Sequence, residues 1–269
     1  MSPARSAIRF QVDGRSCSGR RGESLLDALR RNGFEVPSLC HLPGLPPAGA
    51  CRLCLVEVIR GGRRKLTTSC NYPLIEGLEV ELDSERVQRH RRMVLELLLG
   101  LAPRSDRLRR LAARYGVEHS RFVRPSDPPD CILCGLCARI CRRGARAEAL
   151  AVAGRGRNKR LAARPFGDFP ESCIGCGACA WVCPTGAIEM ESEAVARLRS
   201  RWGHSRPCRY ALLGLLPGTV CENDYDCSRC EVDQRLVDAA GGRHPVTLLL
   251  DAEQADQDEG ADQAGEEPR

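Results

Sequence analysis

The protein has 269 residues, of which 42% are hydrophobic and 28% charged, and its formal net charge is +6. Only 4% of the residues are aromatic while 17 are cysteines, so we expect small domains held together by more than apolar burial. No apolar run approaches the roughly 18 residues of a membrane span, and the N-terminus lacks the apolar segment of a secretory signal. We therefore expect a cytoplasmic protein whose reduced cysteines bind metal instead of forming disulfides.

The charge is unevenly distributed along the chain. Residues 251–269 hold eight acidic residues and one arginine, so the basic residues are concentrated in the preceding part. A basic body is compatible with nucleic-acid binding, but aromatic side chains for base stacking are scarce. Bound iron–sulfur clusters would also each add about two negative charges. We therefore expect no nucleic-acid partner, and we expect residues 241–269 to be an acidic, disordered tail.

The first 83 residues have the pattern of a small α+β domain. Alternating apolar residues at 8–12 predict a strand that turns at Asp13-Gly14. A short helix is expected to open at Glu23-Ser24 and close at Asn32-Gly33. Further strands are expected at 54–59, at 65–68 after the Gly61-Gly62 turn, and at 79–82. This succession favours an α+β fold for residues 1–83.

Residues 84–125 are expected to form a helical connector. Ser84 is the predicted N-cap of a first helix that ends at Pro103. Asp106 is the predicted cap of a second helix that closes at Gly116. The apolar stripe expected on the first helix consists of Val87, Val94, Leu97, Leu98 and Leu101.

Eight cysteines in the middle of the chain repeat one spacing twice. Cys131-x2-Cys134-x2-Cys137-x3-Cys141 is followed by Cys173-x2-Cys176-x2-Cys179-x3-Cys183-Pro184. This spacing is typical of ferredoxins with two [4Fe–4S] clusters, in which the fourth cysteine of each run binds the other cluster. A pair of zinc ribbons is the alternative, which we disfavour because each run offers three close thiolates and only a distant fourth.

We therefore predict two clusters with crossed ligands in a domain at residues 126–192. One [4Fe–4S] cluster is expected on Cys131, Cys134, Cys137 and Cys183. The second is expected on Cys173, Cys176, Cys179 and Cys141. Three glycines in these runs allow backbone N–H groups to approach the sulfurs, namely Gly135, Gly175 and Gly177.

Four earlier cysteines have the spacing Cys40-x10-Cys51-x2-Cys54-x15-Cys70. A plant-type [2Fe–2S] ferredoxin uses C-x4-C-x2-C and a distant fourth cysteine, so here only the first gap is longer. We predict a [2Fe–2S] cluster on these four residues, with a structural zinc site as the alternative. His41 is expected to be a flanking residue, because four thiolates already complete the site.

Three blocks of this sequence resemble a known family in the same order. They are HLPGLPPAGACRLCLVEV, RRMVLELLL, and the two cysteine runs DCILCGLCARIC and CIGCGACAWVCPTGAI. The chain resembles the small iron–sulfur diaphorase subunit of bidirectional NAD-linked hydrogenases over residues 6–190. It equally resembles the N-terminal part of the large iron–sulfur subunit of NADH dehydrogenase and of NAD-linked formate dehydrogenases. The resemblance implies a β-grasp [2Fe–2S] domain, a two-[4Fe–4S] ferredoxin domain and a flavin-bearing, NADH-oxidising partner.

The chain departs from this family between the two cluster domains. The family usually has a further cluster there on one histidine and three cysteines, whereas residues 71–130 contain no cysteine. We therefore expect that cluster to be absent. His90 and His119 are expected to be ordinary surface histidines.

A last group of cysteines occupies the C-terminal segment, residues 193–240. Its spacing is Cys208-x12-Cys221-x5-Cys227-x2-Cys230. We predict a tetrathiolate site, for which structural zinc is slightly favoured over an iron–sulfur cluster; free thiols around a short helix are the alternative. The remaining cysteine, Cys17, is expected to be a small buried thiol in a strand.

The functional prediction is an electron-transfer subunit rather than a catalyst. The sequence has no Gly-x-Gly-x-x-Gly fingerprint after a strand and no hydrolase signature. Its clusters are expected to carry single electrons between a flavin subunit and a terminal redox subunit of an NAD(P)-linked complex. The alternative function is an iron–sulfur redox sensor or adaptor that recruits a partner through its C-terminal cysteines.

Overall fold

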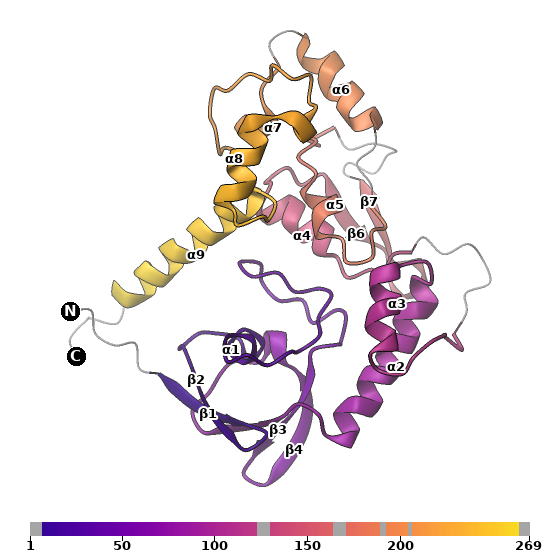
Figure 1. Ribbon diagram of the computed structural model, residues 1–269, viewed down its shortest axis with the longest axis vertical. Coiled ribbons are helices and arrows are strands. Elements are labelled where there is room, and N and C mark those ends of the chain that lie inside the picture. The colour runs from indigo at the N-terminus through magenta and orange to yellow at the C-terminus, as the bar shows by residue number, and fades with distance from the viewer. Residues whose placement is uncertain (1–6, 123–129, 164–170, 189–191, 204–205, 264–269) are drawn as a thin grey trace. The chain divides into compact units, whose positions relative to one another are not determined.

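The computed structural model describes residues 7–122, 130–163, 171–188, 192–203 and 206–263 (Figure 1). The chain divides into two compact units. The first consists of Met1–His41, Pro47–Cys134 and Pro184–Ala187. The second consists of Leu42–Pro46, Gly135–Cys183 and Ile188–Arg269. No helix in the described ranges is both long and apolar enough to cross a membrane.

A five-stranded mixed sheet forms the base of the first unit. Its strands, in the order β2-β1-β5-β3-β4, are β1 (Ile8–Val12), β2 (Arg15–Gly19), β3 (Leu55–Arg60), β4 (Arg63–Thr68) and β5 (Leu78–Glu81). β1 and β5 are parallel, and the other neighbours are antiparallel. Helix α1 (Leu25–Arg31) shares a core with this sheet. This arrangement confirms the expected α+β fold.

Local chemistry explains the start of α1 and the first hairpin. The Ser24 hydroxyl accepts a hydrogen bond from the Asp27 N–H at 3.2 Å and so caps the helix. Asp13 and Gly14 both have positive φ, 48° and 78°, as a tight two-residue hairpin requires. Cys17 lies in β2 with 6% exposure, as predicted. The 3-10 helix η1 (Ser69–Asn71) follows β4.

Two helices, α2 (Glu85–Leu101) and α3 (Asp106–Ala113), complete the first unit. They contribute to a second core that also contains the loop carrying the first cysteines, so they do not form a separate connector layer. Its buried members are Leu39, Cys40, Cys51, Leu53, Leu95, Leu98, Leu99, Ala102, Leu108, Ala112 and Ile132.

The structure corrects two details of these helices. The N-cap of α3 is Ser105 rather than Asp106, because the Ser105 hydroxyl faces the Leu108 N–H at 3.5 Å. Leu97 does not belong to the packing face, since it is 45% exposed. The buried face of α2 keeps Val87 and Leu98 of the predicted stripe and adds Arg91, Leu95 and Leu99.

This difference in burial predicts a large contrast between two neighbouring leucines. Leu95→Ala should lower the free energy of unfolding of the first unit by about 2–5 kcal/mol, because Leu95 is fully buried. Leu97→Ala should change it by only about 0.5 kcal/mol. Anaerobic urea unfolding followed by circular dichroism measures both. Equal destabilisation by the two variants would contradict the assigned face of α2.

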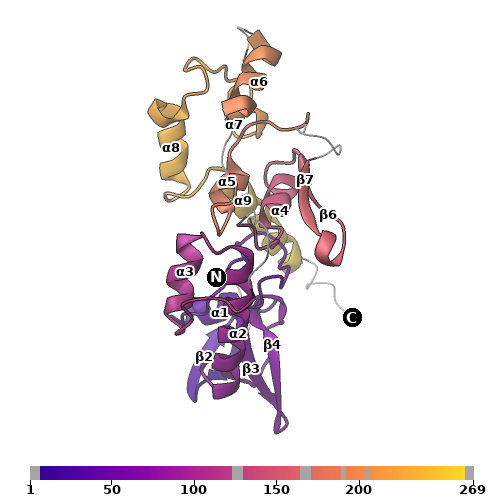
Figure 2. The same cartoon turned by 90° about the vertical axis from the view of Figure 1, so that its right-hand side faces the viewer.

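The second unit contains α4 (Leu136–Arg143) and α5 (Ala178–Val182), which pack against each other. Each follows a glycine in the left-handed region, Gly135 at φ 69° and Gly177 at φ 81°. Between them in sequence lies a hairpin of β6 (Leu150–Ala153) and β7 (Arg160–Ala163), joined through the 3-10 helix η2 (Gly156–Asn158) (Figure 2). The two cysteine runs thus have the same local structure, in which a left-handed glycine is followed by a short helix.

The C-terminal part of the second unit is helical. It consists of α6 (Ser192–Trp202), α7 (Arg209–Leu212), the 3-10 helix η4 (Cys227–Arg229), α8 (Glu231–Ala239) and α9 (Val246–Gln263).

The disorder expected for residues 241–269 is wrong over α9. This helix begins with an apolar turn in which Val246 and Leu250 are buried. Two glycines allow it to approach closely, because a Cβ at Gly144 or Gly44 would lie 2.8 Å from Val246 or Leu250. The last six residues of the tail lie outside the described residues.

Candidate iron–sulfur centres

The four cysteines predicted to hold the [2Fe–2S] cluster lie together in the first unit. Cys40 and Cys51 are in the loop before β3, and Cys54 directly precedes that strand. Cys70 lies in η1, directly after β4. All four are at most 2% exposed. Strand pairing between β3 and β4 therefore brings Cys54 and Cys70 to the same end of the sheet.

The four thiols form two pairs. Cys40 shares a hydrogen bond with Cys51, and Cys54 shares one with Cys70, while Cys40 acts electrostatically on both members of the second pair. Two adjacent pairs are the ligand arrangement that a cluster of two irons requires, because each iron of a [2Fe–2S] cluster is bound by two thiolates.

Backbone amides and burial determine the electrostatics of these thiols. The Leu39 N–H points at Cys51 Sγ and the Cys51 N–H at Cys40 Sγ, both at 3.4 Å. The hydrogen bond from Cys70 lowers the pKa of Cys54 to about 6, although burial opposes this shift. The hydrogen bond with Cys54, together with burial, raises the pKa of Cys70. Amide donors of this kind stabilise bound thiolates and tune the potential of a cluster.

His41 is engaged by a carboxylate. Its Nε2 lies 2.8 Å from Asp27 Oδ1, and its side chain is 4% exposed. Burial alone would raise the pKa of Asp27, but hydrogen bonds from His41 and Ser24 lower it. This geometry fits a flanking role for His41. His90 and His119 are both exposed, as expected for surface histidines.

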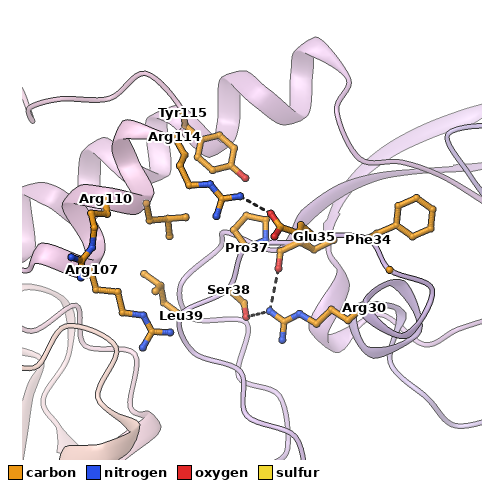
Figure 3. Close-up of a pocket in the computed structure, with 13 residues that line it drawn as sticks. Arg30, Phe34, Glu35, Pro37, Ser38, Leu39, Arg107, Arg110, Arg114 and Tyr115 are labelled. Atoms are coloured by element: carbon orange, nitrogen blue, oxygen red, sulfur yellow. Dashed lines mark hydrogen bonds and ion pairs between the residues drawn. The ribbon is translucent and has the colours of Figure 1, made fainter.

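An open pocket of about 590 Å³ adjoins this site (Figure 3). It is lined by residues 33–39, by Arg30 of α1, by residues of α3 and by two residues just beyond its end. Arg114 binds Glu35 at 2.5 Å, and Arg30 donates to Val36 and Ser38, as Figure 3 shows. The other two lining arginines are Arg107 and Arg110, so positive charge predominates.

In the second unit, one predicted set of [4Fe–4S] ligands is brought together. Cys173 and Cys176 lie before α5, Cys179 lies within it, and Cys141 lies near the end of α4. The four thiols act electrostatically on one another. Burial raises the pKa of Cys176 to about 12 and that of Cys179 to about 11. The Ala149 N–H points at Cys141 Sγ at 3.3 Å.

The other predicted [4Fe–4S] set is divided between the two units. Cys131 and Cys134 belong to the first unit, and Cys137 and Cys183 to the second. The Leu133 N–H points at Cys131 Sγ at 3.4 Å, because Leu133 adopts φ 53°. The assignment of these four cysteines to one [4Fe–4S] cluster stays a prediction from their spacing in the sequence.

His244 was not predicted from the sequence. Its Nε2 lies 2.8 Å from the carbonyl oxygen of Cys176, and its Nδ1 accepts from the Val246 N–H at 3.1 Å. These partners define the neutral form with the proton on Nε2, and burial accordingly lowers the pKa of His244. The Trp181 ring lies 5.8 Å away. Nothing in the sequence near His244 indicates this contact, because it joins positions 68 residues apart.

Comparison with known proteins now identifies the two domains. Residues 5–85 match the model of a 2Fe-2S iron-sulfur cluster binding domain, and residues 168–189 match that of a 4Fe-4S binding domain. A solved structure of an NAD+-reducing [NiFe]-hydrogenase superposes with a TM-score of 0.59 and 31% sequence identity. That match covers 69% of this chain and 88% of the hydrogenase chain. The chain belongs to the iron–sulfur subunits of NAD(P)-linked oxidoreductases.

Curated relatives of this iron–sulfur subunit agree with the assignment, because they are subunits of oxidoreductases and hydrogenases. The NADP-reducing hydrogenase subunit HndD of Solidesulfovibrio fructosivorans is 32% identical over 166 residues, which is 51% of this chain and 28% of the relative. The mitochondrial NADH-ubiquinone oxidoreductase 78 kDa subunit of Candida albicans is 32% identical over 179 residues, 57% of this chain and 25% of the relative.

A third relative is the NADPH-Fe(3+) oxidoreductase subunit alpha of Geobacter sulfurreducens (strain DL-1 / KN400). It is 28% identical over 172 residues, 55% of this chain and 20% of the relative. The matched part of the chain thus spans between 20% and 28% of the length of these curated relatives. The resemblance predicted from the three sequence blocks is confirmed.

Proposed function

We propose that this iron–sulfur subunit relays single electrons, in a cytoplasmic NAD(P)-linked oxidoreductase complex, between a flavin-bearing subunit and a terminal redox subunit. The observation that carries the proposal is the buried, paired set Cys40, Cys51, Cys54 and Cys70, with amide N–H groups aimed at its sulfurs. A cluster held in this way can change charge with little ligand movement, which suits it to one-electron transfer.

The second cluster set supports a relay of several steps. Cys141, Cys173, Cys176 and Cys179 form a separate set within the second unit. When bound, the clusters supply the redox chemistry. The chain's own residues hold them, exclude water and direct amide donors at the sulfurs.

We further propose that the arginine-lined pocket receives an acidic surface of the flavin partner. The pocket wall includes Leu39, whose chain neighbour is the ligand Cys40 and whose N–H points at Cys51 Sγ. A partner bound there would lie next to the [2Fe–2S] site. Four arginines against one glutamate provide charge complementarity to such a surface.

Charge reversal in the pocket should slow electron entry. Arg107→Glu combined with Arg110→Glu should lower the rate of NADH-driven reduction by the partner at least about 10-fold at low salt. The difference should shrink at high ionic strength because exposed charges are screened. The matched control is Arg60→Glu with Arg63→Glu, two exposed arginines paired at the β3–β4 hairpin, which do not line the pocket. An equal effect of both double variants would contradict docking at this pocket.

The proposed function is tested by anaerobic purification of the complex from native cells, followed by addition of NADH. We expect a flavin-bearing subunit to co-purify and NADH to bleach the visible absorption of the clusters. The matched variant is Cys54→Ser, which should remove the bleaching of the [2Fe–2S] cluster and also slow NADH-driven bleaching of the remaining clusters, because the proposed docking pocket lies next to the [2Fe–2S] site. Purification with a transcriptional regulator and no flavin protein would favour the alternative function, a redox sensor.

A further inference from the structure

The buried face of helix α2 contains one charged residue, Arg91. Its side chain is 2% exposed and is among the largest fully buried side chains in the described residues. An arginine is almost never fully buried unless it is paired, because its charge loses the stabilisation that water provides. Arg91 therefore needs negative charge and hydrogen-bond acceptors in its surroundings.

The part of the chain that the structure describes supplies only some of this compensation. The ion pair of Arg91 found there is a long one, at 3.4 Å from Asp83, whose carboxylate is 72% exposed. The Nε of Arg91 is buried and has no hydrogen-bond partner within the described ranges. Glu57, the buried carboxylate of the neighbouring strand β3, accepts a hydrogen bond from Arg86 instead. The positive charge of Arg91 is thus buried and incompletely neutralised.

The strongest contact of Arg91 is with the backbone that follows a predicted cluster ligand. One of its terminal nitrogens donates to the Leu55 carbonyl oxygen at 2.8 Å, and Leu55 directly follows Cys54. The Cys54 carbonyl accepts from the Ser69 N–H on the β4 side of β3, so the next carbonyl points to the β5 side. There β5 pairs only with residues 57–59. Arg91 therefore supplies the donor that the sheet lacks and fixes the chain next to Cys54.

The next turn of α2 connects Arg91 to the other pair of thiols. Leu95 lies four residues further along the same helix face and is fully buried. It belongs to the core that contains Cys40 and Cys51. Arg91 is thus bonded beside Cys54 and lies one helical turn from the core of the other two ligands, all within the first unit.

The [2Fe–2S] cluster predicted at these cysteines is the kind of anion that Arg91 lacks. With four thiolates, an oxidised [2Fe–2S] cluster carries about two negative charges. One added electron makes a third, with no bond broken and no proton taken up. In a buried site, a fixed positive charge stabilises the more negative form of a nearby group. The guanidinium of Arg91 therefore favours the reduced cluster over the oxidised one.

We propose that Arg91 is a positioning residue of the [2Fe–2S] site, which holds the backbone after Cys54 and raises the reduction potential of the bound cluster. This inference deepens the proposed function and rests on it for the presence of that cluster. The charge of Arg91 makes the site a better acceptor of one electron from the flavin partner, which is oxidised as the cluster is reduced.

Redox titration of the purified full chain with dithionite, followed by electron paramagnetic resonance of the [2Fe–2S] signal, tests the proposal. Arg91→Gln keeps an N–H donor and removes the charge. At the wild-type midpoint potential, it should lower the ratio of reduced to oxidised [2Fe–2S] cluster about 5-fold or more, with the iron content retained. Arg91→Lys keeps the charge and should return the ratio close to the wild-type value. The matched control is Arg92→Gln, at the exposed neighbouring arginine, which should leave the ratio unchanged because water and salt screen its charge.

The outcomes separate an electrostatic role from a structural one. Equal midpoint potentials in wild type and Arg91→Gln, or an equal shift in Arg91→Gln and Arg91→Lys, would overturn the proposal. The titration requires neither NADH nor a partner. A wild-type chain without any [2Fe–2S] signal would instead contradict the assignment of the site itself, and with it the proposed function.

A second variant covers the case in which Arg91→Gln does not fold. Asp83→Asn changes an exposed carboxylate and removes the negative charge that lies 3.4 Å from Arg91. It should shift the ratio the other way, toward the reduced cluster, by about 2-fold, because water screens most of this interaction. The matched control is Glu85→Gln, since Glu85 is also exposed but pairs with Arg89. The same potential in Asp83→Asn and Glu85→Gln would contradict the role of Arg91.

Discussion

Replacing Cys141 by serine is expected to remove about four irons from the chain, and these should come from the cluster of the second cysteine run. Cys141 is the last cysteine of the first run, yet its thiol interacts with Cys173, and Cys176 and Cys179 in turn interact with it. The Ala149 N–H also points at its sulfur at 3.3 Å. Loss of this ligand should therefore leave the second-run cluster with three thiolates.

Cys183→Ser is the complementary variant. By the same crossed pattern it should damage the cluster assigned to Cys131, Cys134 and Cys137. Electron paramagnetic resonance of the reduced proteins can assign each lost signal. Cys17→Ser is the matched control, because Cys17 is also a buried thiol but packs in the core of the first unit, where its Sγ donates to the Arg15 carbonyl oxygen within β2. If each variant disturbed the cluster of its own run, the crossed assignment would be wrong.

The isolated chain should not oxidise NADH, whereas dithionite should reduce its clusters. The reason is chemical, because a hydride donor delivers two electrons together and an iron–sulfur cluster accepts one. A flavin partner is needed to divide the pair, and the sequence contains no dinucleotide fingerprint.

The measurement is anaerobic visible absorption after addition of each reductant to the purified chain. NADH alone should leave the spectrum unchanged, and NADH with the flavin subunit should bleach it. Dithionite bleaching is the control that shows intact clusters. Sustained NADH oxidation by the purified chain without a partner would mean that it contains a nucleotide site and is itself the catalyst.

Much of the first unit could be predicted because its signals are local. Asp13-Gly14 specifies a tight turn with two positive φ angles, and the Ser24 hydroxyl caps the residues that follow it. The cysteine spacings are likewise local signals, because cysteines two or three residues apart in sequence indicate the ligands of an iron–sulfur cluster. Burial of the strands then follows from their alternating pattern.

The features that escaped prediction depend on contacts distant in sequence. Leu97 and Leu95 are equally apolar, and which of them is buried depends on the core that α2 shares with α3 and with the loop carrying Cys40 and Cys51. Helix α9 has an acidic sequence typical of disorder, but its first turn packs against Gly144 and Gly44. His244 reaches Cys176 across 68 residues, and neither residue carries a local sign of the other.

The double role of Leu39 has a thermodynamic consequence. Its side chain lines the arginine-rich pocket, while its backbone N–H points at Cys51 Sγ. A ligand of the pocket that shortens or lengthens this N–H to sulfur contact would change the reduction potential of a cluster bound at the site. Linkage then requires the reverse effect of equal size: the reduced and oxidised forms of the subunit must bind that ligand with different affinities. A partner that moved this contact on docking would therefore bind more tightly to one redox form of the subunit than to the other.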